Sequence, residues 1–173
     1  YYNTSRVVQF SWYLLDFDNI REDLSIELIK NFIVKCNFDI PEDSVNIHGI
    51  SNDISNKHGV DINIILSELE KDIDESNAFL AHNTLFDYNV LLSELYRNDK
   101  KTMIKKMDGI MTNGELFCSG LMTKYILKLG KYKNKMPKLK ELYAYCFGTE
   151  PQNQHDARYD VMALVEIAIG RQC

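Results

Sequence analysis

The sequence predicts an α/β domain in which helices cover a central mixed sheet. Short segments rich in β-branched and aromatic residues come first as a hairpin, and further such segments then alternate with amphipathic helical segments. The chain has 173 residues, of which 45% are hydrophobic and 26% are charged, which is the composition of a globular protein. This length suits one domain with a buried core, and we expect a single domain over residues 1–173.

The hairpin comes from the first 35 residues. Residues 6–15, RVVQFSWYLL, are apolar and aromatic and predict a mostly buried strand, and DFDN at 16–19 predicts a turn. A second strand is expected within 26–35, although this pattern also fits a helix. Residues 38–44 are broken by a proline and predict a loop, and apolar residues at helical spacing predict an amphipathic helix over 60–73.

The rest of the chain alternates strands with helices. Two short apolar segments predict strands at 77–83 and 115–119. Helices are expected, in order, over 85–96, 121–129, 137–147 and 157–169. Gly130 and Gly148 are expected to end the second and third of these helices, and Pro137 to occupy the first turn of the third, where its missing N–H is harmless.

Composition also limits the class of protein. The longest apolar runs fall far short of the roughly 18 residues that a membrane span requires, and the N-terminal residues lack the layout of a secretory signal. Four cysteines without metal-ligand spacing, Cys36, Cys118, Cys146 and Cys173, predict reduced thiols in a cytoplasmic protein. A net charge of −5 argues against a protein that coats nucleic acid.

The charge is unevenly distributed along the chain. Residues 124–140, KYILKLGKYKNKMPKLK, hold seven lysines and no acidic residue. Such a segment is either a solvated face or a local rim that contacts phosphates on an otherwise acidic protein.

The segment HDARYD places His155 and Asp160 five positions apart, just before an apolar run. On a helix these two side chains would point roughly 140° away from each other. If they share a site, His155 therefore lies on a loop and Asp160 lies in the first turns of the helix that follows. The alternative is structural, with an exposed histidine and an aspartate that interacts favourably with the helix dipole.

A second polar segment, LAHNTLFD at 80–87, follows a predicted strand and leads into a helix that carries Asp87. The carboxyl ends of strands are where α/β sheets place their sites. Two aspartates without a cysteine or histidine cluster suit a hard cation such as Mg²⁺ or Mn²⁺. The structural alternative is a capping box formed by Thr84 and Asp87.

HNTLFD followed about 70 residues later by HDARYD resembles the second and third motifs of the DnaQ-like (DEDDh) 3′–5′ exonucleases, which have the ribonuclease H-like fold. RVVQFSWYLLD resembles the second strand of that family, and NIHGIS at 46–51 resembles its HGI segment. Residues 116–129 and 136–167 resemble its C-terminal third. The resemblance implies a mixed sheet of strand order 3-2-1-4-5, flanked by helices, over nearly the whole chain.

The resemblance also implies roles for individual residues. Asp87 and Asp160 would be ligands of two divalent cations, Mg²⁺ or Mn²⁺, and His155 would be the general base that deprotonates the attacking water. Phe86 and His48 are expected to contact the terminal nucleotide. Asn83 is a further candidate for substrate binding, although it is expected mainly to hold the turn.

The first motif of the family, Asp-x-Glu on the central first strand, is absent from these residues. Asp16-Phe17-Asp18 is not expected to replace it, because it aligns with the turn between the second and third strands. The chain is therefore expected to be either an N-terminally incomplete copy of an active enzyme or a degenerate homologue that only binds nucleic acid. With the central strand absent, residues 6–15 and 77–83 are expected either to pair with each other or to stand apart, and this chain alone to be inactive.

The function expected from the resemblance is metal-dependent hydrolysis of phosphodiester bonds at nucleic-acid 3′ ends, releasing nucleoside 5′-monophosphates. DNA is the expected substrate, in proofreading or end trimming, with a DNA polymerase as a potential partner. Two alternatives remain at this stage. One is an inactive nucleic-acid-binding or polymerase-associated homologue, and the other is a structural protein whose aspartates only begin helices.

Overall fold

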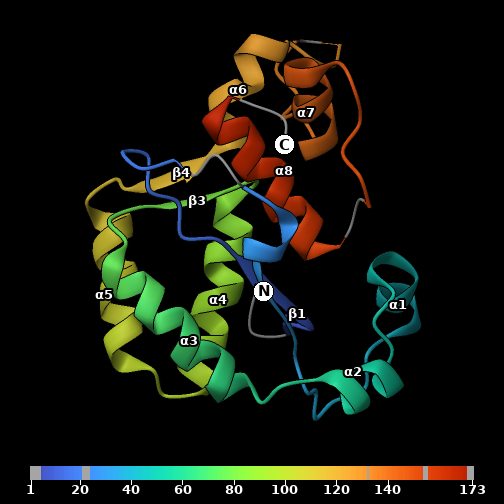
Figure 1. Cartoon of the computed structure of the whole chain (residues 1–173), viewed down its shortest axis with the longest axis vertical. Coiled ribbons are helices and arrows are strands. Elements are labelled where there is room, and N and C mark those ends of the chain that lie inside the picture. Colours follow the sequence, from blue (N-terminus) through green and yellow to red (C-terminus); the bar gives the residue numbers. More distant parts are fainter. Residues whose placement is uncertain (1–4, 21–23, 132, 154–155, 171–173) are drawn as a thin grey trace.

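The computed structural model describes the chain except for residues 1–4, 21–23, 132, 154–155 and 171–173. Its described part is a mixed α/β structure with eight α-helices and two small sheets. Helices α3, α4 and α5 form a layer on one side of the two sheets, and α8 crosses the other side of the first sheet (Figure 1). This arrangement confirms the predicted fold class. No helix within the described ranges has both the length and the hydropathy needed to cross a membrane.

The first sheet is the expected hairpin. Strand β1 (Gln9–Trp12) pairs antiparallel with β2 (Lys30–Ile33), so that Phe10 lies opposite Phe32. A 3₁₀ turn, η2 (Ile26–Leu28), precedes β2. The prediction of a mostly buried first strand was wrong, because every residue of β1 is only half-buried.

The second sheet joins β3 (Phe79–Ala81) and β4 (Leu116–Cys118) in parallel, with Leu80 opposite Phe117. No backbone pairing in the described ranges joins this sheet to the first one. Of the two outcomes expected for residues 6–15 and 77–83, the structure therefore has the one in which they stand apart.

Three helices supply most of the core. They are α3 (Ile62–Glu75), α4 (Thr84–Arg97) and α5 (Lys101–Thr112). Their buried side chains form one cluster, made of Leu66, Leu69, Ile73, Tyr88, Leu91, Leu95, Met103, Met107 and Ile110. Phe10 and Trp12 of β1 and Phe79 of β3 pack against the same cluster. Both sheets therefore rest on one helical layer.

Two short helices form an arm between β2 and α3. They are α1 (Glu42–His48) and α2 (Asn52–His58), and the sequence did not predict them. The arm is fixed to the first sheet where Val60 bridges Val34, with the Lys35 N–H donating to the Val60 carbonyl at 2.9 Å. A Cβ on Gly59 would lie 2.6 Å from the Lys35 Cα, so only glycine fits this close approach without displacement.

The C-terminal third contains α6 (Ser119–Leu127), α7 (Leu139–Phe147) and α8 (Ala157–Ile169). As predicted, α8 begins at Ala157 and α7 ends at Gly148, which has a φ of 73°. Pro137 was expected in the first turn of this helix, and this prediction was wrong. Lys138 is the N-cap of α7, so Pro137 lies just before the helix. The helix expected over 121–129 ends earlier, at Leu127, before Gly130.

Candidate active site

The turn between β3 and α4 carries the first candidate aspartate. Asn83 adopts a left-handed backbone conformation, with a φ of 69°, which asparagine tolerates better than most residues. The Thr84 hydroxyl donates to the Ala81 carbonyl at 2.8 Å and also contacts the Phe117 carbonyl, so it ties the ends of β3 and β4 together. Asp87 follows in the first turn of α4. The capping-box alternative for Thr84 is wrong, because Asn83 is the N-cap and the Thr84 hydroxyl serves the strands.

The second candidate aspartate lies on α8. Asp156 caps this helix by accepting a hydrogen bond from the Arg158 N–H at 2.9 Å. The Asp160 N–H donates to the Asp156 carbonyl at 3.0 Å, which places Asp160 in the first turn, half-buried. The predicted position of Asp160 at the start of the last helix is thus confirmed.

The carboxylates of Asp87 and Asp160 interact electrostatically. Asp87 is open to solvent on one side, but the protein atoms around it displace enough water to raise its pKa to about 6. A hydrogen bond with its own backbone N–H opposes this rise, and the negative charge of Asp160 adds to it. Two segments that are more than 70 residues apart therefore bring two acidic side chains close enough to interact electrostatically.

The other predicted residues lie in different settings. Phe86 precedes Asp87 on α4 and is 48% exposed, so an apolar surface borders the aspartate. His48 ends α1, where its Nδ1 accepts a hydrogen bond from the Ile50 N–H at 3.1 Å, and burial lowers its pKa. Asn83 makes no side-chain cap of α4. His155 lies outside the described residues.

The acidic turn that follows β1 has a local structural role. The Asp16 carboxylate accepts hydrogen bonds from the Asp18 N–H at 2.9 Å and from the Asn19 amide at 2.8 Å. The hydrogen bond from Asn19 is the main reason that the pKa of Asp16 is lowered. Asp16 and Asp18 are both exposed, which agrees with the expectation that this turn is not the missing motif.

Sequence reasoning missed the residue that connects β1 to α8. The Gln9 amide donates to the Asn31 side chain at 2.9 Å and to the Asp156 carboxylate at 3.1 Å, and its carbonyl accepts from the Ala157 N–H at 3.3 Å. Gln9 therefore fixes the N-terminal turn of α8, and with it Asp160, to the first sheet. The sequence signal was the alternation of the polar residues Gln9 and Ser11 with Phe10 and Trp12.

His82 was also missed as a connecting residue. Its Nε2 lies 2.8 Å from the Pro137 carbonyl and its Nδ1 lies 2.9 Å from the Ser119 hydroxyl. Because a carbonyl oxygen only accepts, Nε2 carries a hydrogen. His82 thus joins the end of β3 to the start of α6 and to the segment before α7, next to the turn that leads to Asp87.

Asp87 and Asp160 form a pair and not a complete ligand set. Within the ranges that the structure describes, no three histidine, cysteine or acidic side chains are grouped so that they could hold a metal ion. The two carboxylates nevertheless suit a hard divalent cation, which would relieve the repulsion between them. The chemistry of this donor pair fits Mg²⁺ or Mn²⁺ better than a soft metal.

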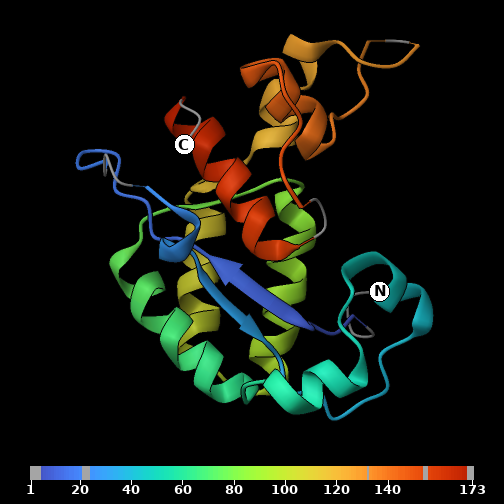
Figure 2. The same cartoon turned by 45° about the vertical axis from the view of Figure 1, so that its right-hand side comes forward.

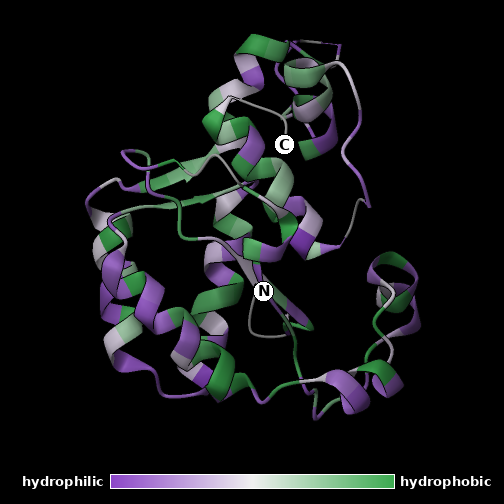
Figure 3. Cartoon of the chain, in the orientation of Figure 1, coloured by the Kyte–Doolittle hydropathy of each residue, from purple (hydrophilic) through white to green (hydrophobic). Residues whose placement is uncertain are grey.

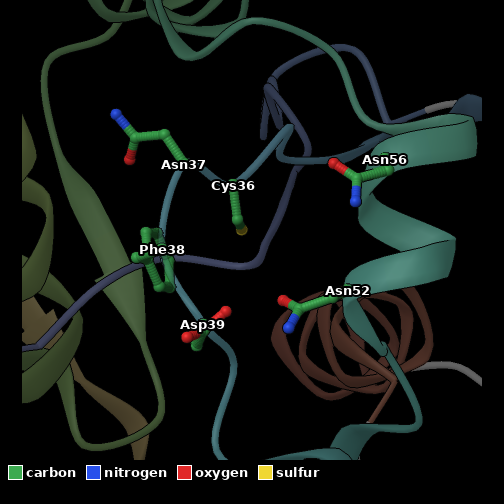
Figure 4. A pocket seen from close by; sticks show the side chains of 6 residues that line it. All are labelled: Cys36, Asn37, Phe38, Asp39, Asn52 and Asn56. Carbon is green, nitrogen blue, oxygen red and sulfur yellow. The ribbon is translucent and has the colours of Figure 1, made fainter.

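An open pocket of about 300 Å³ lies elsewhere, between the segment after β2 and helix α2. Figure 4 shows its lining, formed by Cys36, Asn37, Phe38, Asp39, Asn52 and Asn56. None of the candidate site residues lines it. Asp39 is its single acidic side chain, so we assign no chemistry to this pocket.

Comparison with known proteins agrees with the geometry. Residues 15–168 match the model of the exonuclease family RNase_T. The match covers most of the chain and includes Asp87 and Asp160. No curated protein matches the sequence at the level required. The chain therefore belongs to the DnaQ-like exonuclease family, whose fold is ribonuclease H-like.

Proposed function

We propose that this protein acts as a metal-dependent 3′–5′ exonuclease that removes nucleoside 5′-monophosphates from DNA ends. Membership of the exonuclease family supports a nuclease activity in general. The polarity, the preference for DNA and the need for divalent cations are the parts that we propose. A DNA polymerase is the partner that a proofreading role would require.

The observation that carries this proposal is the electrostatic coupling of Asp87 and Asp160. An acidic pair costs free energy when both members are ionised, and the negative charge of Asp160 adds to the rise in the pKa of Asp87, to about 6, that burial mainly causes. A purely structural role gives no reason to hold two carboxylates in one field. A site that binds cations does, since each cation lowers this repulsion.

Asp87 and Asp160 would hold the cations, and each contributes from the first turn of a helix. Bound divalent cations would lower the pKa of the attacking water and stabilise the charge that develops on the phosphate. In this family-based assignment His155 takes the proton from that water. Phe86, exposed beside Asp87, offers an apolar contact for the terminal base, with His48 and Asn83 as further contacts.

The test uses a linear single-stranded DNA labelled at its 5′ end and a circular DNA of the same composition. The protein is assayed as it is and also joined, ahead of Tyr1, to an extended segment of the pattern apolar-Asp-x-Glu-Thr. With Mg²⁺ or Mn²⁺ the extended protein should shorten the linear DNA stepwise and release 5′-mononucleotides. Chelation should stop the reaction, and the circular DNA should remain intact.

Substitutions in the extended protein identify the residues responsible for hydrolysis. Asp87→Ala and Asp160→Ala should each lower kcat by about 10²–10³-fold, since each removes a metal ligand. His155→Ala should lower kcat by about 10²–10⁴-fold while the binding of DNA ends is nearly unchanged. The matched control is the double variant Asp16→Ala, Asp18→Ala, which should keep full activity. Activity that depends on Asp16 and Asp18, or cleavage of the circular DNA, would contradict the proposal.

A further inference from the structure

Helix α6 presents an apolar face to solvent. Leu121, Met122, Tyr125 and Ile126 are 51%, 63%, 66% and 58% exposed, and their spacing places them along one side of the helix. Figure 3 shows hydrophobic stretches of α6 separated by paler and hydrophilic residues. A row of large apolar side chains exposed to this degree is typical of an interaction surface.

A lysine-rich hairpin follows this face directly. Lys128 ends α6 in a left-handed conformation, and an antiparallel bridge between Leu129 and Lys135 closes the loop. Figure 2 shows the described residues of this loop extending away from the helices. Lys135 pairs with Glu141 at 2.9 Å, whereas the exposed Lys128 and Lys133 have no ion pair within the described part of the chain.

The start of helix α6 lies beside the turn that leads to the candidate active site. Helix α6 starts at Ser119, which contacts His82 in the turn that leads to α4 and Asp87. A Cβ on Gly120 would lie 3.3 Å from the His82 ring, so the first turn of α6 packs closely against that turn. Nine residues of helix extend about 14 Å from there to the hairpin.

We propose that this surface, α6 together with the described hairpin residues 128–131 and 133–135, binds the single strand of nucleic acid that leads away from the 3′ end held at Asp87 and Asp160. The inference rests on the proposed function. Bases would stack on Tyr125 and the neighbouring apolar side chains, while phosphates contact Lys128 and Lys133. The Lys124 ammonium lies over one face of the Tyr125 ring, 4.9 Å from its centre, so it places a positive charge at this ring.

Charge decides between the potential occupants of this surface. Seven lysines and no acidic residue lie within 124–140, in a protein with a net charge of −5. Two copies of the chain meeting through this surface would bring the two sets of lysines together, which is unfavourable. The phosphates of a single-stranded nucleic acid would pair with the lysines, and its exposed bases would pack on the apolar face.

The experiment measures binding in the presence of a chelator, so that no turnover is needed. Fluorescence anisotropy compares oligonucleotides of about 12 and about 3 nucleotides at several salt concentrations. The test variant is Lys128→Glu, Lys133→Glu. The matched control is Lys57→Glu, Lys105→Glu, which makes the same charge change at exposed lysines of α2 and α5. Urea midpoints confirm that both variants remain folded.

The test variant should bind the longer oligonucleotide about 10–100-fold more weakly, and the slope of log K against log salt concentration should fall by about 1.4. The shorter oligonucleotide should bind with less than about threefold change, and the control variant should bind both like the parent. Three results would overturn the inference: no binding by the parent, equal losses in the test and control variants, or equal losses for both lengths.

Three further outcomes separate this inference from the proposed function and from other partners. Lysine-dependent binding without any hydrolysis by the extended protein would refute the exonuclease and leave the binding surface standing. Hydrolysis that is indifferent to the lysines, on long and short substrates alike, would do the reverse. Anionic vesicles are the final probe, and lysine-dependent binding to vesicles but not to oligonucleotides would identify a lipid-binding surface and overturn the proposal.

Discussion

The two sheets rest on the same helical layer but differ in the face that they turn away from it. On β1 and β2 this face is polar, because Gln9, Ser11 and Asn31 hydrogen-bond to one another there and Gln9 reaches α8. On β3 and β4 the corresponding face carries Leu80 and Phe117, which are 37% and 43% exposed. The polar face is therefore covered by a helix, and the apolar pair is not.

This difference indicates how the two candidate aspartates are positioned. Asp160 lies on α8, which is fixed to the first sheet through Gln9, whereas Asp87 lies on α4, directly after β3 of the second sheet. Since no strand pairing within the described ranges connects the two sheets, their relative position depends on the shared helical layer. The geometry of the acidic pair is thus sensitive to how the two sheets are held on that layer.

The largest expected effect comes from joining the two sheets. An extended segment of the pattern apolar-Asp-x-Glu-Thr, placed ahead of Tyr1, should pair with β1 on one side and with β3 on the other. A ladder of several backbone hydrogen bonds, each contributing about 0.5–1.5 kcal/mol, should raise the free energy of unfolding by roughly 5 kcal/mol. Urea unfolding monitored by circular dichroism measures the change.

The control for this experiment is the same segment with prolines at two alternating positions, which removes the donors needed for pairing. It should leave the urea midpoint where it is in the parent chain. If both segments raised the midpoint equally, pairing between the sheets would not be the cause. The two sheets would then remain separate even with the added segment present.

A smaller effect is expected where α8 meets the first sheet. Asp156→Ala removes both the cap of α8 and the acceptor of Gln9, so it should cost about 1 kcal/mol of stability, within a range of about 0.5–2. It should also lower kcat more than it alters KM, because Asp160 loses its support. Asp61→Ala is the matched control, since Asp61 caps α3 in the same way, far from α8 along the chain. Equal losses of kcat in both variants would exclude a positioning role for Asp156.

The smallest effect concerns Asp87 itself. Its pKa is raised to about 6 in the folded protein, so Asp87 ionises more easily in the unfolded chain. Ionisation of Asp87 therefore does not lower the free energy of unfolding below about pH 4. It lowers this free energy increasingly as the pH rises, and by the full amount above about pH 6. Asp87→Asn should therefore stabilise the metal-free protein at pH 7 by about 1 kcal/mol after allowance for solvent screening. Thermal unfolding with a chelator at pH 4 and pH 7 measures this. A variant equally stabilised at both values would show that ionisation is not the cause.

Local patterns predicted the elements that have strong periodicity. The helix start at Ala157 and the helix end at Gly148 followed from the chemistry of single residues. Helices α1 and α2 were missed because each has only seven residues, and Pro41 was interpreted as breaking a loop although it is the N-cap of α1. Helix α5 was missed although Met103, Met107 and Ile110 have helical spacing, because no strand or polar motif drew attention to this segment.

The positions of the two aspartates of the candidate site were predictable from the sequence. Asp87 and Asp160 each stand at the start of a helix that the sequence predicted, and the resemblance to the family connected them. The role of Gln9 was not predictable, because its partner Asp156 is 147 positions away and nothing local indicates the contact. The half-buried state of β1 also depends on what lies beside it, which the pattern of its own side chains does not contain.

The hydrogen bonds of His82 also have a spectroscopic consequence. The chain contains four histidines, and the Nε2 hydrogen of His82 is held against the Pro137 carbonyl. A ring hydrogen held in this way exchanges slowly with water and gives a nuclear magnetic resonance signal separate from those of freely solvated rings. Because this hydrogen bond joins β3 to the segment before α7, that one signal reports whether the C-terminal third is docked, in the intact protein and without any added label.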